Sequence, residues 1–245
     1  MPVHLMSIAS TLEEIHERMA RAARRVGRNP AEVALMAVSK THPASAILEA
    51  LSAGQTLFGE NRVQEFAAKR EQLGPQAAPA KFHLIGHLQS NKAARAVELF
   101  DAIDTLDSLR LAQRLNQEAE RLGRTLDVLV EINLGGEAAK SGIDPASDEL
   151  PSLLEAQPRL PNLAIRGLMT VPPYTEDPEG ARAFFRRLRQ LRDQQRASTG
   201  LALPELSMGM SHDFEVAIEE GSTCVRVGTA IFGARTYQTD EETSQ

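Results

Sequence analysis

Residues 33–43 of the chain read Val33-Ala34-Leu35-Met36-Ala37-Val38-Ser39-Lys40-Thr41-His42-Pro43. Six apolar residues in succession predict a strand that is buried on both faces, as in parallel sheets. Lys40 then stands at the carboxyl end of this strand, where α/β barrels and open α/β sheets build their binding sites. Such a lysine can be a cation for an anionic ligand, a nucleophile that forms a Schiff base once desolvation lowers its pKa, or a side chain that simply extends into solvent.

The pattern of a short apolar strand followed by a helix recurs along the chain. Eight such units match a (β/α)8 barrel of the TIM type, and a doubly wound open sheet is the alternative. An additional amphipathic helix over about residues 10–26 precedes the first strand. No linker interrupts the pattern, so we expect one domain over residues 1–245, with the barrel over about 33–235 and a polar tail over 239–245. The expected strands cover residues 33–39, 56–58, 81–85, 100–103, 126–134, 163–171, 206–208 and 224–227.

Composition excludes some classes of partner. The 245 residues include 27 Lys and Arg and 33 Asp and Glu, a formal net charge of −6, which argues against a nucleic-acid-binding protein. The single cysteine, Cys224, cannot form an internal disulfide, and we expect it to be buried in a strand rather than to act as a nucleophile. No apolar stretch reaches the roughly 18 residues of a membrane span, and residues 1–15 do not form a signal peptide. We therefore expect a cytoplasmic protein without a membrane partner.

Two later segments would share a face with Lys40 if the fold is a barrel. Gly228 and Thr229 follow the last strand and open a predicted short helix, and barrels commonly seat a phosphate there on free N–H groups. Ser211, in the loop after the seventh strand, would add a hydroxyl donor. The alternatives are a plain turn for Gly228 and a helix N-cap for Ser211, with Asp213 as the competing cap.

Arg226 alternates with Val225 and Val227 in the last strand, so it faces the opposite side of the strand. If that side is the barrel interior, the buried cation needs a partner, such as a ligand in the mouth. If it faces the helices, Arg226 is an ordinary arginine that extends to solvent. A lysine, a phosphate seat and an arginine at one barrel mouth are the groups that a pyridoxal 5'-phosphate (PLP) site requires.

The chain closely resembles the pyridoxal phosphate homeostasis protein family, the single-domain relatives of the alanine racemase barrel. The resemblance runs from about residue 33 to residue 235, and its motifs together are highly specific. They are Ala37-Val38-Ser39-Lys40-Thr41, Phe58-Gly59-Glu60-Asn61-Arg62-Val63-Gln64-Glu65, His83-Leu84-Ile85-Gly86-His87-Leu88-Gln89-Ser90-Asn91-Lys92, Gly167-Leu168-Met169-Thr170, Leu206-Ser207-Met208-Gly209-Met210-Ser211 and Val225-Arg226-Val227-Gly228-Thr229-Ala230-Ile231-Phe232-Gly233.

This resemblance implies a PLP barrel of fold type III in which Lys40 holds the cofactor as an internal aldimine. It places Asn61 beside the pyridine ring, the phosphate on the last two loops, and Arg226 against the ring nitrogen. Because an arginine stays protonated, it would donate to that nitrogen and leave the ring a weaker electron sink. The cofactor-binding residues implied by the resemblance are Lys40, Asn61, Met208, Ser211, Arg226, Gly228 and Thr229.

The expected function is binding of PLP for intracellular PLP homeostasis, with little or no catalysis. By resemblance, alanine racemase relatives carry a second, β-rich domain that brings another catalytic residue to the mouth, and this sequence of 245 residues offers only Tyr174 and Tyr237 as tyrosines. We expect a monomer that hands the cofactor to PLP-dependent apoenzymes. The alternatives are a PLP-dependent amino-acid racemase or lyase completed by a partner, and a Schiff-base aldolase without a cofactor. For His83 and His87 we expect packing roles rather than metal binding.

Overall fold

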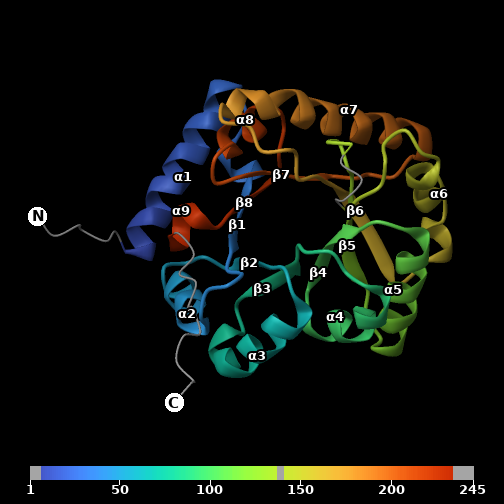
Figure 1. Ribbon diagram of the computed structural model, residues 1–245, viewed down its shortest axis with the longest axis horizontal. Helices are drawn as coiled ribbons and strands as arrows, with labels where there is room; N and C mark the ends of the chain where they lie inside the picture. The colour runs from blue at the N-terminus through green and yellow to red at the C-terminus, as the bar shows by residue number, and fades with distance from the viewer. Residues whose placement is uncertain (1–6, 137–140, 234–245) are drawn as a thin grey trace, which may run out of the picture.

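The strands of the protein close into a barrel. The computed structural model describes residues 7–136 and 141–233. Eight strands pair in the order β1 to β8, and β8 pairs with β1, with every neighbouring pair parallel (Figure 1). The predicted (β/α)8 barrel is confirmed, and the doubly wound sheet is excluded because closure leaves no free edge.

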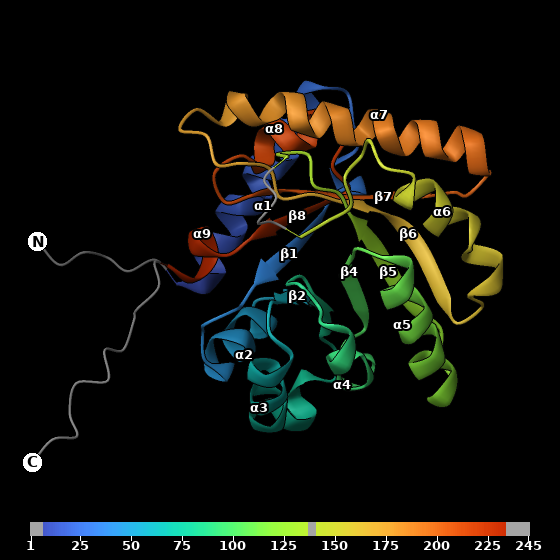
Figure 2. The same ribbon diagram turned by 45° about the vertical axis from the view of Figure 1, so that its right-hand side comes forward.

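Each strand is followed by at least one helix, and the helices lie outside the strands (Figures 1 and 2). The strands are β1 (Ala34–Val38), β2 (Leu57–Glu60), β3 (Lys81–Leu84), β4 (Ala102–Leu106), β5 (Leu126–Glu131), β6 (Leu163–Met169), β7 (Glu205–Met210) and β8 (Cys224–Val227). The α-helices are α1 (Ile8–Arg25), α2 (Ala44–Ser52), α3 (Val63–Leu73), α4 (Ala93–Leu99), α5 (Leu109–Arg121), α6 (Glu149–Glu155), α7 (Arg182–Thr199), α8 (Phe214–Glu219) and α9 (Thr229–Phe232). The predicted tail over 239–245, the barrel end near 235 and Tyr237 lie outside the described residues.

The additional N-terminal helix is present as α1. Ser7 caps it by accepting a hydrogen bond from the Ser10 N–H, and its apolar side is buried while its charged side is exposed. The helix lies beside α8 (Figure 1), where Arg18 Nε and Glu215 Oε1 are 3.1 Å apart. Within the described ranges, none of the helices has the length and apolar character that a membrane crossing requires.

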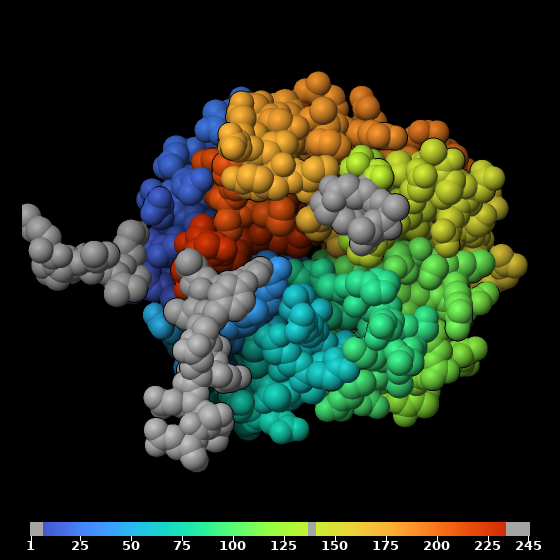
Figure 3. Space-filling model, viewed as in Figure 1, coloured from blue at the N-terminus to red at the C-terminus, as the bar shows by residue number. Residues whose placement is uncertain are grey.

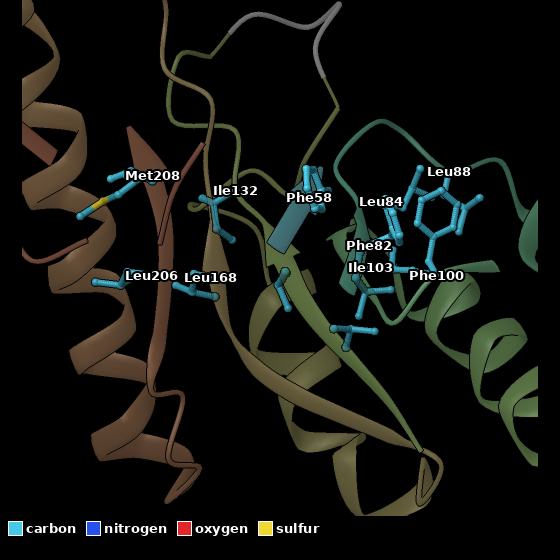
Figure 4. Packing of buried hydrophobic residues seen from close by; sticks show 14 of the residues in the cluster. Phe58, Phe82, Leu84, Leu88, Phe100, Ile103, Ile132, Leu168, Leu206 and Met208 are labelled. Atoms are coloured by element: carbon cyan, nitrogen blue, oxygen red, sulfur yellow. The ribbon is translucent and has the colours of Figure 1, made fainter. Parts of the chain in front are cut away.

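An apolar layer fills the space between the strands and the helices. Its largest members are phenylalanines in ring contact: Phe58 stacks on Phe82 with ring centroids 5.5 Å apart, and Phe66 lies tilted against Phe82 with ring centroids 4.5 Å apart. Figure 4 shows this layer continuing on the far side of the barrel, where Leu206 and Met208 extend from β7 toward the neighbouring helix. This packing fixes the strands, and therefore the carboxyl-end loops that carry the candidate site.

Three strands extend further at their carboxyl ends than the sequence predicted. Glu60 ends β2, Asp104 lies inside β4, and β7 continues through Ser207 to Met210. The sequence predicts strand ends before Glu60 and Asp104, but each of these carboxylates has a partner in the folded chain, Lys69 for Glu60 and His83 for Asp104. Because a satisfied polar group can be buried, its polarity did not end the strand.

The partly buried His83 of β3 pairs with the buried Asp104, and the distance from His83 Nδ1 to Asp104 Oδ1 is 3.0 Å. Burial lowers the pKa of His83, but the opposing charge of Asp104 and its hydrogen bond dominate, so the pKa lies above the ordinary value of 6.5. Because the pKa of His83 is higher in the folded than in the unfolded state, the ion pair stabilises the protein, and this stabilisation is complete at pH values below the unfolded-state pKa. That stabilisation is lost as the pH rises through the folded-state pKa.

We therefore expect His83→Gln to destabilise the protein more in mildly acidic than in mildly alkaline solution. The measurement is urea unfolding of the wild type and the variant at about pH 6 and about pH 9, on either side of a histidine pKa. A difference in the free energy of unfolding that is the same at both pH values would contradict the assignment of His83 and Asp104 as an ion pair.

Candidate functional site

Lys40 lies in the turn that directly follows β1, and its side chain is partly buried. It lines a cavity of about 590 Å³. Figure 3 shows a hollow on this face, between the blue to teal segments of the first strands and the orange to red segments of the last ones. The cavity wall comes from the segments that follow several strands, namely Lys40, Asn61, Ile85, Gly86, His87, Glu131, Ile132, Asn133, Ser141 and Val171. The structure thus places Lys40 in a pocket at the barrel mouth.

Asn61 lies beside Lys40 in this cavity, one residue after β2. Its Oδ1 atom is buried and has no hydrogen-bond partner among the described residues. The main chain of Asn61 packs directly against Gly86, because a Cβ atom at Gly86 would lie 2.2 Å from the Asn61 carbonyl oxygen. An orphaned, rigidly held acceptor in a cavity is the feature expected where a ligand supplies the missing donor.

The segment after β7 meets the segment after β8 through Ser211. The Ser211 hydroxyl oxygen accepts the N–H of Gly228 at 3.2 Å and that of Ala230 at 3.4 Å. Two main-chain N–H groups therefore converge on one oxygen atom, the Oγ of Ser211, whose own hydroxyl hydrogen is a further donor. This cluster of donors suits an anion, and Thr229 lies between the two amides with an exposed side chain.

The alternatives for these residues are resolved by their contacts. Asp213, not Ser211, closes the turn before α8, because its carboxylate accepts the Met210 N–H at 2.6 Å. Gly228 is more than a turn residue, since a Cβ atom there would lie 3.1 Å from the Val38 carbonyl oxygen. The absence of a side chain lets this loop pack directly against the end of β1.

Arg226 faces the barrel interior. Val225 and Val227 belong to the outer apolar layer, whereas Arg226 reaches past β7, donating from Nη2 to the Thr170 carbonyl at 2.8 Å and from Nη1 to the Ser207 hydroxyl at 2.7 Å. It is 3% exposed, and burial lowers its pKa from the ordinary arginine value. A guanidinium has five N–H donors, so two hydrogen bonds leave capacity for a ligand at the mouth.

Met208 occupies a different environment from the other six predicted residues. Its side chain is fully buried in the outer apolar layer (Figure 4). Its carbonyl accepts the Ser222 hydroxyl at 2.8 Å. The strand alternation that turns Ser207 toward Arg226 turns Met208 away from it. Any contact between Met208 and a ligand at the mouth would therefore come from its main chain.

Glu131, at the end of β5, is a further cavity residue outside the predicted set. It is 7% exposed, and its Oε2 atom has no hydrogen-bond partner within the described ranges. Burial raises the pKa of this carboxyl. His87 lines the same cavity, with its Nδ1 3.2 Å from Asp107 Oδ2. Its signal in the sequence is a charge flanked on both sides by apolar residues, within Val128-Leu129-Val130-Glu131-Ile132.

The sequence is similar to a known protein family over most of its length. Residues 10–236 match the family model described as alanine racemase, N-terminal domain. A curated protein of Aquifex aeolicus named pyridoxal phosphate homeostasis protein is 44% identical over 232 residues, covering 95% of this chain and 100% of that protein. The protein of the same name from Escherichia coli K12 is 45% identical over 238 residues, covering 94% and 97%.

Solved structures of related proteins have the same fold. PipY of Synechococcus elongatus PCC7942, determined with PLP bound, has a TM-score of 0.77 and 43% identity, covering 89% of this chain and 100% of that one. Alanine racemase of Clostridium difficile 630 shares the fold at a TM-score of 0.69 and 17% identity, and this chain covers 58% of it. By the full-length match to the curated relatives and the match to the family model, the chain belongs to the pyridoxal phosphate homeostasis proteins within the alanine racemase N-terminal domain family.

Proposed function

We propose that this protein binds PLP at the barrel mouth, through the amine of Lys40, and serves PLP homeostasis. The observation that carries the proposal is the position of Lys40 in a cavity next to the orphaned Asn61 acceptor. The names of the relatives and the PLP bound to PipY support the same conclusion. When bound, PLP supplies an aldehyde that condenses with amines and a ring that withdraws electrons.

The residues of this chain fit that cofactor. Lys40 supplies the amine, and Asn61 offers an acceptor beside it. Ser211 and the main-chain N–H groups at Gly228 and Ala230 would hold the phosphate, with Thr229 in the same segment. Arg226 would face the ring nitrogen and, as a permanent donor, would keep that nitrogen unprotonated.

We infer that the protein stores and delivers the cofactor, with little turnover of its own. A ring nitrogen held by Arg226 weakens the electron withdrawal on which carbanion chemistry depends. Tyr174 is 77% exposed and packs on His212, with ring centroids 5.5 Å apart, so it does not belong to the cavity wall. PLP-dependent apoenzymes would be the recipients.

We further infer a monomer that works in the cytoplasm. The large hydrophobic side chains exposed on the described surface come from three segments, the end of α1 (Val26), the end of α5 (Leu122) and the loop after β6 (Val171 and Tyr174), and do not suggest a large apolar interface. Cys224 is a buried free thiol whose pKa is raised by burial to about 12, in keeping with a structural cysteine in a reducing compartment.

The test compares PLP with pyridoxal, which has the aldehyde but lacks the phosphate. The purified protein is mixed with each compound, passed through a desalting column, and examined by absorbance and, after borohydride reduction, by intact mass. We expect one PLP per chain to remain and at least tenfold weaker retention of pyridoxal, because charge-assisted hydrogen bonds to a phosphate are strong. Equal retention of both compounds would show that the last two loops do not bind phosphate.

A further inference from the structure

Lys40 lies in a turn that is held under backbone strain. Ser39 N donates to the Gly59 carbonyl at 3.1 Å, and His42 N donates to the Ser39 carbonyl at 3.1 Å. Between them, Thr41 has a φ of +67°, in the left-handed region that L-residues other than glycine avoid. Such a conformation costs on the order of 1–3 kcal/mol and persists only where surrounding contacts enforce it.

The side chains of Glu60, Glu65 and Lys69 enforce this conformation through hydrogen bonds to the residues on both sides of Lys40. On the near side, Lys69 Nζ donates to the Ser39 carbonyl at 3.0 Å, and the Ser39 hydroxyl donates to Glu60 Oε1 at 2.8 Å. On the far side, the Thr41 N–H donates to Glu65 Oε1 at 2.8 Å. Glu60 ends β2, and Glu65 and Lys69 belong to α3, so these three side chains connect the turn to two neighbouring elements.

Lys69 links the two carboxylates. Its Nζ lies 2.8 Å from Glu60 Oε1 and 3.0 Å from Glu65 Oε1, and the residue is 7% exposed. Burial by itself raises the pKa of Glu65, but the Thr41 N–H and the Lys69 ammonium hold that pKa below its ordinary value. A buried ion cluster seldom stabilises a protein more than apolar residues of the same volume would. Its hydrogen bonds to main-chain atoms on both sides of Lys40 therefore point to a geometric role.

We propose that Glu60, Glu65 and Lys69 form a positioning network that holds the Lys40 amine where it can react with the aldehyde of PLP. The inference rests on the proposed function and adds residues that do not touch the cofactor themselves. A nucleophile held in place reacts with a high effective concentration, and a freely rotating turn would lose that advantage.

The test uses Lys69→Met and Glu65→Met, with Glu118→Gln of α5 as the control. Glu118 is also 7% exposed and also joins two cations, Arg114 at 2.7 Å and Arg121 at 3.0 Å, but both partners belong to α5 itself and not to the turn that carries Lys40. Its loss reports the general effect of breaking a buried ion cluster. Glu65→Met provides a second route if Lys69→Met does not fold, because the Glu65 side chain is 28% exposed.

Two quantities are measured on each variant. The first is hydrogen exchange at the Thr41 and His42 amides in the ligand-free protein, which reports the order of the turn. The second is the PLP concentration that half-saturates borohydride-fixed labelling of Lys40, together with the pH dependence of its rate. We expect exchange to be at least tenfold faster and half-saturation at least tenfold higher in both methionine variants, with neither changed in Glu118→Gln.

The outcomes separate the two proposals. Folded methionine variants that label like the wild type overturn the positioning network, even if their amides exchange faster, since the ions would then only support the fold. Unchanged exchange overturns it as well. A wild-type protein that takes no label at Lys40 overturns the proposed function instead, and the exchange measurement, which needs no cofactor, still reports whether the ions order the turn.

Discussion

Replacement of Lys40 with alanine is expected to abolish the covalent attachment of PLP to this protein. The amine is the only group of the residue that can condense with the aldehyde, and the methyl group of alanine cannot. The donors at Gly228, Ala230 and Ser211 remain in this variant. We therefore expect Lys40→Ala to retain PLP weakly and reversibly, with a loss of affinity of at least a hundredfold, on the order of 3 kcal/mol.

The measurement is absorbance after desalting, combined with peptide mass mapping after borohydride reduction. The matched control is Lys92→Ala, because Lys92 lines a neighbouring cavity that shares Asn61 and His87 with the site. The control should be labelled at Lys40 to the same extent as the wild type. If Lys40→Ala still carries stoichiometric label at another lysine, the amine that captures the cofactor has been wrongly assigned.

Gly209→Ala is expected to destabilise the protein severely. Gly209 has a φ of +95°, and a Cβ atom there would lie 2.5 Å from Ala217 Cβ and 3.0 Å from Phe214 Cα, both in α8. A strained backbone and an overpacked contact together cost roughly 2–5 kcal/mol. Because Ser211 follows two residues later, any shift of the strand end that relieves the clash would also move Ser211 away from Gly228.

The control for Gly209→Ala is Gly200→Ala. Gly200 has a φ of +73°, but no atom lies within 4 Å of the position of a Cβ atom. This variant carries the backbone strain without the clash, and it should lose only about 1 kcal/mol. Urea unfolding of both variants gives the comparison. Similar losses in the two would mean that α8 moves freely away from β7, against the packing described for this side of the barrel.

The arrangement of the fold could be predicted from sequence because its signals are local. The apolar run of residues 33–38 and the recurring helices specify eight strand and helix units without reference to distant residues. The ends of strands β2, β4 and β7 could not be predicted. Glu60 and Asp104 read as loop residues until Lys69 and His83 are known to lie beside them. Whether a polar residue ends a strand depends on a partner far along the chain.

The candidate site divides in the same way. Lys40 is a candidate from sequence because a cation directly follows a buried strand. Arg226 is a candidate because it alternates with two valines. Lys69 gave no such signal: on a helix with charged neighbours it reads as a surface lysine, and its burial is a property of the folded barrel. The outward direction of Met208 follows from strand alternation only once Ser207 is known to face Arg226 inside the barrel.

The pairing of β1 with β8 has a consequence for the order of events during synthesis. One half of the site, Lys40, follows the first strand, and the other half, Ser211 to Ala230, is made by the last two. A nascent chain on the ribosome exposes the lysine early, while the two loops that we propose for the phosphate are still untranslated. On the proposed function, durable capture of the vitamin waits until the final strand has emerged and the cylinder has shut, so a loaded molecule would be one whose assembly is complete.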